Sequence, residues 1–372
     1  MKWSTVSAVF FLTGVAACVE PYVPNLNLEG QRFTVEATIT DLPEPQYVKL
    51  SYAVAKPFNE FEITAVGLAT VTVLANGVAL VWKETTPGHY EAPVEFRGTV
   101  GTRYQLRLAL ANGQRYESTE EIMPAVPPIA NVYDRFNSQG IARSTDRSVF
   151  WPSNDVYVDV QDPTNERNFY RWDWTLWEKQ QWCSSVRFGG SIGFYDYECR
   201  SKCWDLIFNE TSSLLSDTYS NGRTITGQLV GHIPYYSMPG PTAMGALVEV
   251  RQYGITPGAY RYQKLLQDQS EKTGGLADTP PAPLIGNVRN TGDDTEIVTG
   301  YFTASAVSKR RYWLDRKNAT TPPIGFFQAF HEGRGPNPEP FSPGPPCCRP
   351  PTVPCFASAT RTPDQPEGWQ GF

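Results

Sequence analysis

Apolar and polar residues alternate along the first third of the chain. Apolar side chains occupy every second position of residues 33–39 and again of residues 104–110. This period of two places one set of side chains on each face of a β-strand. Asn76-Gly77 and Asn112-Gly113 separate neighbouring runs, and both dipeptides favour tight hairpin turns. About seven strands at this spacing predict an immunoglobulin-like or transthyretin-like β-sandwich over residues 31–124.

A proline-rich stretch interrupts the alternation. Pro124, Pro127 and Pro128 lie close together, and proline lacks the N–H that a strand ladder needs and biases the preceding residue to extended geometry. We therefore expect a stiff connector over residues 125–130, which separates the first domain from a second domain over residues 131–340.

The second domain begins with another alternating pattern. Val156, Val158 and Val160 lead into Asp162-Pro163-Thr164-Asn165, and alternation resumes over residues 170–176. The pattern predicts a hairpin in which Trp172 and Trp174 share one buried strand face.

One helix is predicted later in the chain. Thr256 suits an N-cap, Pro257 the first helical position and Gly274 the end, while Tyr262 and Leu265 fall on neighbouring turns. Strands resume at residues 297–302 and 311–314. The second domain is therefore expected to be mainly β with one or two helices, followed by an irregular Pro- and Cys-rich tail over residues 341–372.

The N-terminus has the pattern of a bacterial lipoprotein signal. Lys2 precedes a short apolar segment that ends in Val15-Ala16-Ala17-Cys18. The segment is shorter than the ~20 residues of a transmembrane helix. We predict a signal peptide over residues 1–17, lipidation at Cys18 and a linker over residues 18–30, so that the chain attaches to a membrane through lipid. An ordinary cleaved signal peptide is the alternative.

The charge of the remaining chain argues against nucleic acid as a partner. Without Lys2 there are 31 basic and 38 acidic residues. Such a chain repels phosphate backbones and anionic lipid surfaces.

Six cysteines follow Cys18, and in an oxidising compartment an even number predicts disulfides. Three disulfides, fewer with some free thiols, and a zinc site are the alternatives, although the spacing lacks paired C-x2-C motifs. Fifteen pairings are open to six cysteines. We favour a link between an earlier and a later cluster, which would tie the tail to the second domain; the clusters are Cys183, Cys199 and Cys203, and Cys347, Cys348 and Cys355.

The sequence offers little support for catalysis. His89, His232 and His331 have no metal-ligand spacing. Ser191 lies in a G-x-S-x-G match, but the surrounding stretch does not have the strand-turn-helix context of a nucleophile elbow. Asp293, Asp294 and Glu296 lack an EF-hand pattern and are better explained as a solvated turn. We expect no enzyme activity, no metal and no cofactor.

Aromatic residues concentrate around the first cysteine cluster. Six of the ten tryptophans lie within residues 151–204. Those beyond the alternating segment could contact a protein partner or a ligand, because recognition often resides on loops held by a rigid frame. The predicted contact residues are Trp177, Trp182, Phe194, Tyr195 and Tyr197.

Short segments along nearly the whole mature chain resemble one family. They are Cys18-Val19-Glu20-Pro21, residues 35–41, 48–51, 69–73, 87–90, 101–106, 162–163, 169–172, 259–262, 280–283, 286–287 and 300–305, and Cys355 with residues 366–369. Their order and spacing are similar to those of the Bacteroidota lipoproteins of domain of unknown function family 4249.

This resemblance implies a location and a partner. Members are outer-membrane lipoproteins typically encoded beside a TonB-dependent transporter, and the family has no assigned reaction. The expected function is a non-enzymatic accessory subunit of such a transporter, on either the periplasmic or the cell-surface side of the outer membrane. The alternative is a free-standing surface lipoprotein that binds glycan or peptide.

Overall fold

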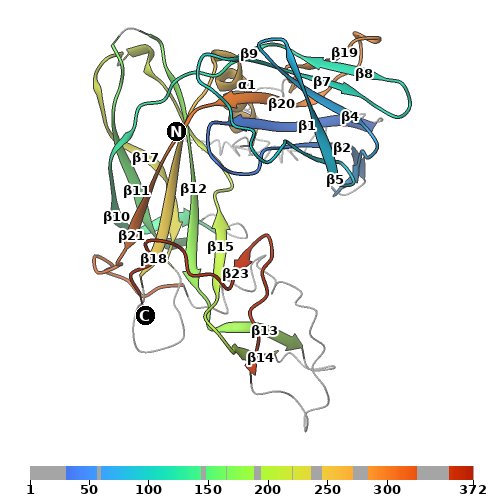
Figure 1. The fold of residues 1–372 in the computed structure, drawn as a ribbon. Helices are drawn as coiled ribbons and strands as arrows, with labels where there is room; N and C mark the ends of the chain where they lie inside the picture. Colours follow the sequence, from blue (N-terminus) through green and yellow to red (C-terminus); the bar gives the residue numbers. More distant parts are fainter. Residues whose placement is uncertain are drawn as a thin grey trace, which may run out of the picture.

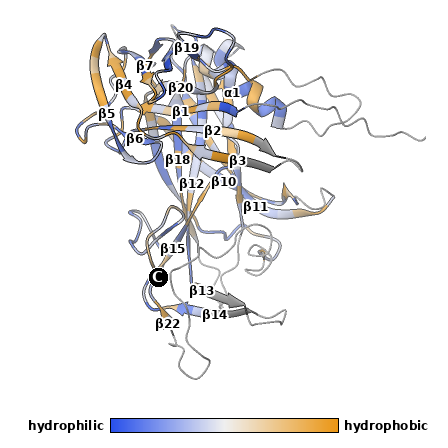
Figure 2. Cartoon of the chain, turned by 90° about the vertical axis from the view of Figure 1, so that its right-hand side faces the viewer, coloured by the Kyte–Doolittle hydropathy of each residue, from blue (hydrophilic) through white to orange (hydrophobic). Residues whose placement is uncertain are grey.

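The computed structural model describes residues 31–56, 60–143, 148–164, 166–187, 194–219, 221–235, 245–270, 284–324 and 352–371. The fold is mainly β (Figure 1). Two sandwich-like lobes lie side by side, and a small cysteine-rich lobe extends from the second one at the end far from the first (Figures 1 and 2). No helix among the described residues is long and apolar enough to cross a membrane.

The N-terminal lobe is a single sheet of eleven strands folded around one core. Strand β5 changes partner along its length, pairing first with β4 and then with β6, and this bends the sheet into two layers. The sheet order is β19 (Val288–Asn290), β8 (Arg115–Ser118), β7 (Arg103–Ala109), β4 (Thr70–Ala75), β5 (Val78–Thr86), β6 (His89–Glu91), β2 (Tyr47–Lys56), β1 (Gln31–Thr40) and β20 (Thr299–Ser305), with β3 (Glu60–Ala65) on β2 and β9 (Glu121–Ile122) on β7.

The predicted alternation and hairpins of this lobe are confirmed. Side chains at every second position of β1 and β7 are buried. The β4–β5 turn has Asn76 at φ 47° and Gly77 at φ 85°. Two consecutive positive φ angles match the tight turn that joins twisted antiparallel strands.

The predicted boundary between the two domains is wrong. Strands β19 and β20 come from the predicted second domain (131–340), yet β19 pairs with β8 and β20 pairs with β1 in parallel. Gly300 permits the β1–β20 contact, since a Cβ at this position would lie 2.0 Å from the Val35 carbonyl oxygen. Pairing between segments this distant leaves no local pattern in the sequence.

The second lobe packs two sheets face to face around a second core. The smaller sheet contains β10 (Ile129–Ala142), β11 (Phe150–Gln161) and β17 (Thr224–Pro234). The larger sheet is ordered β21 (Val307–Leu314), β18 (Ala246–Gly254), β12 (Phe169–Lys179), β15 (Trp204–Phe208) and β23 (Arg361–Thr362), with β16 (Ser213–Ser216) also on β12. Trp172 and Trp174 of β12 are buried, as predicted.

The predicted hairpin between residues 156–160 and 170–176 is wrong. Strands β11 and β12 lie in different sheets, so the turn at Asp162 crosses from one layer to the other. The Asp162 carboxylate stabilises this crossing by accepting hydrogen bonds from the Tyr170 hydroxyl at 2.5 Å and the Gly222 N–H at 2.9 Å. Alternation predicts a strand and its buried face, but it does not identify the neighbouring strand.

The single α-helix of the described residues is α1 (Pro257–Ser270), and a 3-10 turn, η2 (Asp217–Tyr219), precedes β17. Thr256 caps α1 as predicted, because its Oγ1 accepts a hydrogen bond from the Ala259 N–H at 3.2 Å. The predicted end at Gly274 lies outside the described residues.

Charged side chains hold the two lobes together. Glu44, in the turn after β1, accepts hydrogen bonds from Arg251 of β18 at 2.7 and 3.0 Å and from Lys309 of β21 at 3.2 Å. Burial opposes ionisation of Glu44, but these two cations outweigh it, so the pKa of Glu44 lies below its ordinary value.

Candidate functional site

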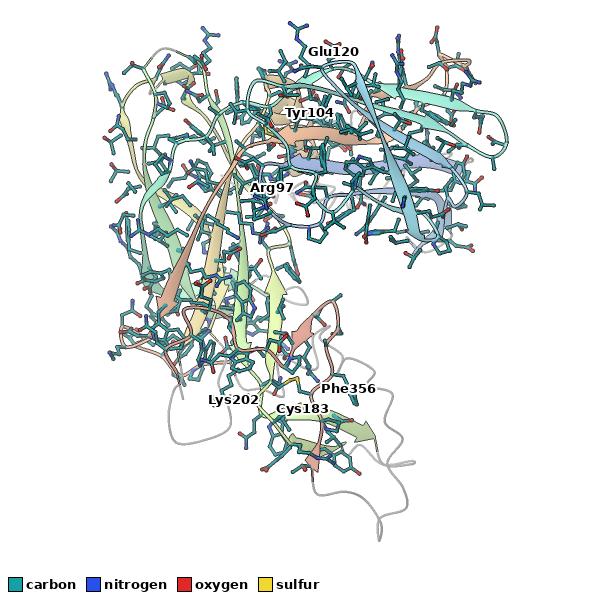
Figure 3. The ribbon with its side chains drawn as sticks, in the orientation of Figure 1. Arg97, Tyr104, Glu120, Cys183, Lys202 and Phe356 are labelled. Carbon is teal, nitrogen blue, oxygen red and sulfur yellow. A yellow bond between two sulfur atoms is a disulfide. The ribbon has the colours of Figure 1, made fainter. Side chains whose placement is uncertain are left out.

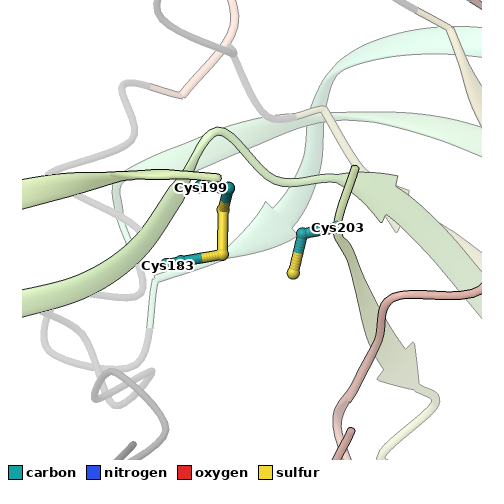
Figure 4. A group of neighbouring side chains, drawn as sticks. All are labelled: Cys183, Cys199 and Cys203. Carbon is teal, nitrogen blue, oxygen red and sulfur yellow. A yellow bond between two sulfur atoms is a disulfide. The ribbon is translucent and has the colours of Figure 1, made fainter. Parts of the chain in front are cut away.

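The cysteine-rich lobe is a small sheet held by two disulfides. It contains β13 (Trp182–Arg187), β14 (Phe194–Cys199) and β22 (Thr352–Val353). Cys183 is bonded to Cys199 across the β13–β14 hairpin (Figure 4), and Cys203 is bonded to Cys355 across 152 residues. Figure 3 shows where Cys183 lies in this lobe. The Cys203–Cys355 bond is the predicted link between the two cysteine clusters. Cys347 and Cys348 lie outside the described residues.

The predicted tail (341–372) is therefore not wholly irregular. Two of its segments join sheets, since β22 pairs with β14 and β23 pairs with β15. Both strands are only two residues long, too short for a periodic pattern to reveal. The pairing arises because the Cys203–Cys355 bond holds this segment beside β14 and β15.

The cysteine sulfurs of this lobe lie close together. The Sγ atoms of Cys183, Cys199 and Cys203 are all within 4.8 Å of one another. Zinc is bound by thiolates, whereas these sulfurs are all engaged in disulfides. Within the described part of the chain, the oxidised lobe therefore offers a disulfide-linked frame and no thiolate ligands.

The predicted contact residues divide between the core and the surface of this lobe. Tyr197 is fully buried among the disulfides, so its prediction as a contact residue is wrong. Tyr197 and Cys199 are two residues apart and therefore lie on the same face of β14, a relation that the sequence alone indicates. Trp182 is half-buried. Phe194 and Tyr195 belong to β14, but their side chains lie outside the described residues.

Trp177 lies at the base of the lobe, half-buried against a cluster of three large apolar side chains. The Arg311 guanidinium lies 5.6 Å from the centroid of the Trp177 ring, within reach of a cation–π contact. The buried members of the cluster are Trp204, Leu247 and Trp369.

A buried arginine attaches the lobe to the second sandwich. Arg361 donates to the Asp205 carboxylate at 2.8 Å and to the Cys183 carbonyl oxygen at 3.1 Å. A second buried arginine, Arg316, lies within the second sandwich and makes a two-fold contact with Glu178, with both N–O distances at 2.8 Å. Neither pair could be predicted from the sequence, because nothing local to an arginine identifies its partner.

A cleft of about 1080 Å³ lies between the two sandwich lobes. Its floor contains Glu121 of β9, which is 4% exposed and accepts hydrogen bonds from Thr256 at 2.6 Å, Tyr301 at 3.0 Å and Asn287 at 3.4 Å. Burial raises the pKa of Glu121 despite these donors. The carboxyl therefore fastens the N-terminus of α1 to the first lobe.

A second pocket of about 690 Å³ lies on the side of the second lobe. Trp151, Trp174 and Phe208 supply aromatic surface, and Glu210 and His232 supply polar groups. A Cβ on Gly231 would lie 2.4 Å from the Trp174 indole nitrogen, so this glycine lets the strand backbone approach the ring closely.

The histidine at this pocket does not form a catalytic triad with Ser153, which shares its aspartate. His232 Nδ1 lies 2.6 Å from an Asp155 carboxylate oxygen, and this bond raises the pKa of His232. Ser153 Oγ donates to the same Asp155 oxygen at 2.6 Å. A serine nucleophile must instead donate to the imidazole. Ser191 and His331 lie outside the described residues.

Three other predicted polar positions have partners among the described residues. His89, which is partly buried, lies 3.3 Å from Glu91. Asp293 accepts hydrogen bonds from the N–H and hydroxyl of Thr295, as expected for a solvated turn. Glu296 accepts from the Tyr116 hydroxyl at 2.9 Å.

One family model covers most of the chain. The family described as a domain of unknown function, DUF4249, matches residues 19–311. The chain belongs to this family. The DUF4249 match includes Cys183, Cys199 and Cys203 but ends before Cys355. No match was found among curated proteins or among solved structures.

Proposed function

We propose that this DUF4249 protein is a Bacteroidota lipoprotein, anchored in the outer membrane through Cys18, that acts as a non-enzymatic accessory subunit of a TonB-dependent transporter. The observation that carries the proposal is the disulfide-held lobe, which extends from the sandwich body (Figure 1). Membership of the family and the lipoprotein pattern at Cys18 support it.

The lobe suits contact with a partner because disulfides tie its described strands together before binding. Two disulfides, buried Tyr197 and the Arg361 contacts hold short strands that have little core of their own. A preordered surface loses less conformational entropy on association than a flexible loop does.

Purification from native outer membranes tests the proposal. The tagged protein is extracted in mild detergent and washed at high salt, and mass spectrometry then identifies the bound proteins. Recovery of a TonB-dependent barrel in near-equal amount supports the accessory function. Recovery of the lipoprotein alone contradicts it.

A Cys18→Ala variant tests the anchor separately. We expect the unaltered protein to carry attached acyl chains, measured by intact-mass spectrometry, and the variant to carry none, because Cys18 is the proposed lipidation site. Acyl chains on the variant, or none on the unaltered protein, would contradict lipid anchoring at Cys18 while leaving the transporter question to the first experiment.

The aromatic pocket favours the second candidate, a glycan-binding surface lipoprotein. Trp151 and Phe208 could stack against a sugar ring while Glu210 accepts hydrogen bonds from its hydroxyls. Binding of the soluble protein to an array of neutral oligosaccharides, lost in Phe208→Ala, would support this candidate. Absence of binding to the whole array would exclude it.

A further inference from the structure

One edge of the N-terminal sheet is only partly paired. Strand β5 pairs with β4 over Val78–Trp82, but β6 covers its other side only over Lys83–Thr86. Figure 2 shows β5 at the outside of this lobe, with hydrophobic residues along it. Over Val78–Trp82, β5 therefore has one neighbour among the described strands.

The geometry of the hairpin identifies the open backbone groups. A two-residue turn makes Ala75 and Val78 the first hydrogen-bonded pair. Alternation then directs the N–H and C=O groups of Ala79 and Val81 away from β4. No hydrogen bond from another described residue reaches these groups. Val78 is 66% exposed and Val81 is 60% exposed.

This edge lacks the features that usually prevent strand addition. Exposed edges are commonly short or charged, since an apolar edge otherwise pairs with other chains. Two other edges of the sheet follow that rule, because β19 has three residues including Arg289 and β3 contains the exposed Glu62. Val78–Trp82 has no charged residue and no proline.

We propose that this open edge of β5 binds an extended, uncharged peptide segment of the transporter by strand addition. This inference rests on the proposed function. The added strand would continue the line of β6, whose last residue is Glu91; the next N–H, that of Ala92, donates to the Gln46 carbonyl oxygen at 3.0 Å, on the side of β2. Its backbone would pair with Ala79 and Val81.

The chemistry of the edge selects this partner. A charged residue facing Val78–Trp82 would find no counter-ion within this segment, so the edge favours an uncharged segment. A stable dimer buries about 1,200–2,000 Å², whereas a five-residue edge is short. Strand addition requires less area because main-chain hydrogen bonds supply much of the affinity. An extended segment therefore fits better than a second copy of the chain.

Substitutions at Val81 test the inference in the tagged lipoprotein purified from outer membranes. Val81→Pro removes the N–H that faces the open edge and leaves the bonds to β4 intact. Val81→Lys places a charge on the edge, and Val81→Thr is the matched control. We expect recovery of the barrel to fall about tenfold in the first two variants and to be unchanged in the control.

The outcomes separate this inference from the proposed function. Full barrel recovery with both Val81→Pro and Val81→Lys, at unchanged thermal stability, overturns strand addition and leaves the accessory function standing. Absence of a barrel with the unaltered protein contradicts the accessory function itself. A dimer of the soluble chain that Val81→Lys converts to a monomer, measured by light scattering, would assign the edge to a second copy and overturn the inference.

Discussion

The buried pair Glu178–Arg316 should contribute far more to stability than the exposed pairs. Arg316 is 1% exposed and Glu178 is 9% exposed, and both carboxylate oxygens contact the guanidinium at 2.8 Å. Arg316 also donates to the Pro234 carbonyl oxygen at 3.2 Å. Glu178→Gln removes the negative charge and leaves the arginine charge buried beside a neutral amide.

The expected loss in the free energy of unfolding is about 3–5 kcal/mol, the cost of leaving one member of a buried ion pair uncompensated. Glu367→Gln is the matched control, because Glu367 pairs with Arg311 at 3.3 Å but its side chain is 95% exposed. That substitution should cost about 0–1 kcal/mol. The two substitutions differ because burial keeps water from solvating the charge left on Arg316, whereas water solvates the charge left on Arg311.

Urea unfolding followed by tryptophan emission measures both losses. Trp82 is the only tryptophan within residues 31–124, so the emission reports mainly the second lobe, where Glu178 lies. The midpoint should fall by about 1–2 M for Glu178→Gln. Equal losses in the two variants, or a loss below about 1 kcal/mol for Glu178→Gln, would refute the reasoning from burial.

Three further predictions follow from the disulfides, a glycine and a histidine. Double alanine substitution of Cys203 and Cys355 should lower the free energy of unfolding by about 5 kcal/mol, and that of Cys183 and Cys199 by about 3 kcal/mol. The difference arises because the first bond closes a loop of 152 residues and the second a loop of 16. Equal changes in the urea midpoint would contradict this. Gly300→Ala should lower the free energy of unfolding by at least about 2 kcal/mol more than Gly113→Ala. Both glycines have φ 89°, but of the two only Gly300 lies close to the backbone of another strand. Similar melting temperatures of the two variants would count against the close β1–β20 contact. His232 has a pKa raised above its ordinary value of 6.5 by the hydrogen bond to Asp155, so its stabilisation is full below pH 6.5 and is lost as pH rises through the folded-state pKa. The difference in melting temperature between the unaltered protein and His232→Gln should therefore shrink from pH 6 to pH 8, and a constant difference would exclude the linkage.

Much of the candidate site was beyond prediction from sequence. The cysteine pattern indicated a link between the two clusters, and Cys203–Cys355 is such a link. The buried position of Tyr197 and the Arg361 contacts with Asp205 and Cys183 depend on segments that meet only after folding. Side-chain accessibility depends on these neighbours, so an aromatic residue near a cysteine loop could not be assigned to the surface from its position alone.

Local sequence patterns predicted the alternating strands β1, β7 and β12, the Asn76-Gly77 turn, and the start of α1 at Thr256 and Pro257. These depend on side-chain period, backbone φ and capping within a few residues. No local pattern predicts that β20 joins β1, that β11 and β12 lie in opposite layers, or that part of the β5 edge stays open. Those features arise from contacts between segments far apart in the chain, where many pairings satisfy the same alternating pattern and only the packing of the complete core selects one.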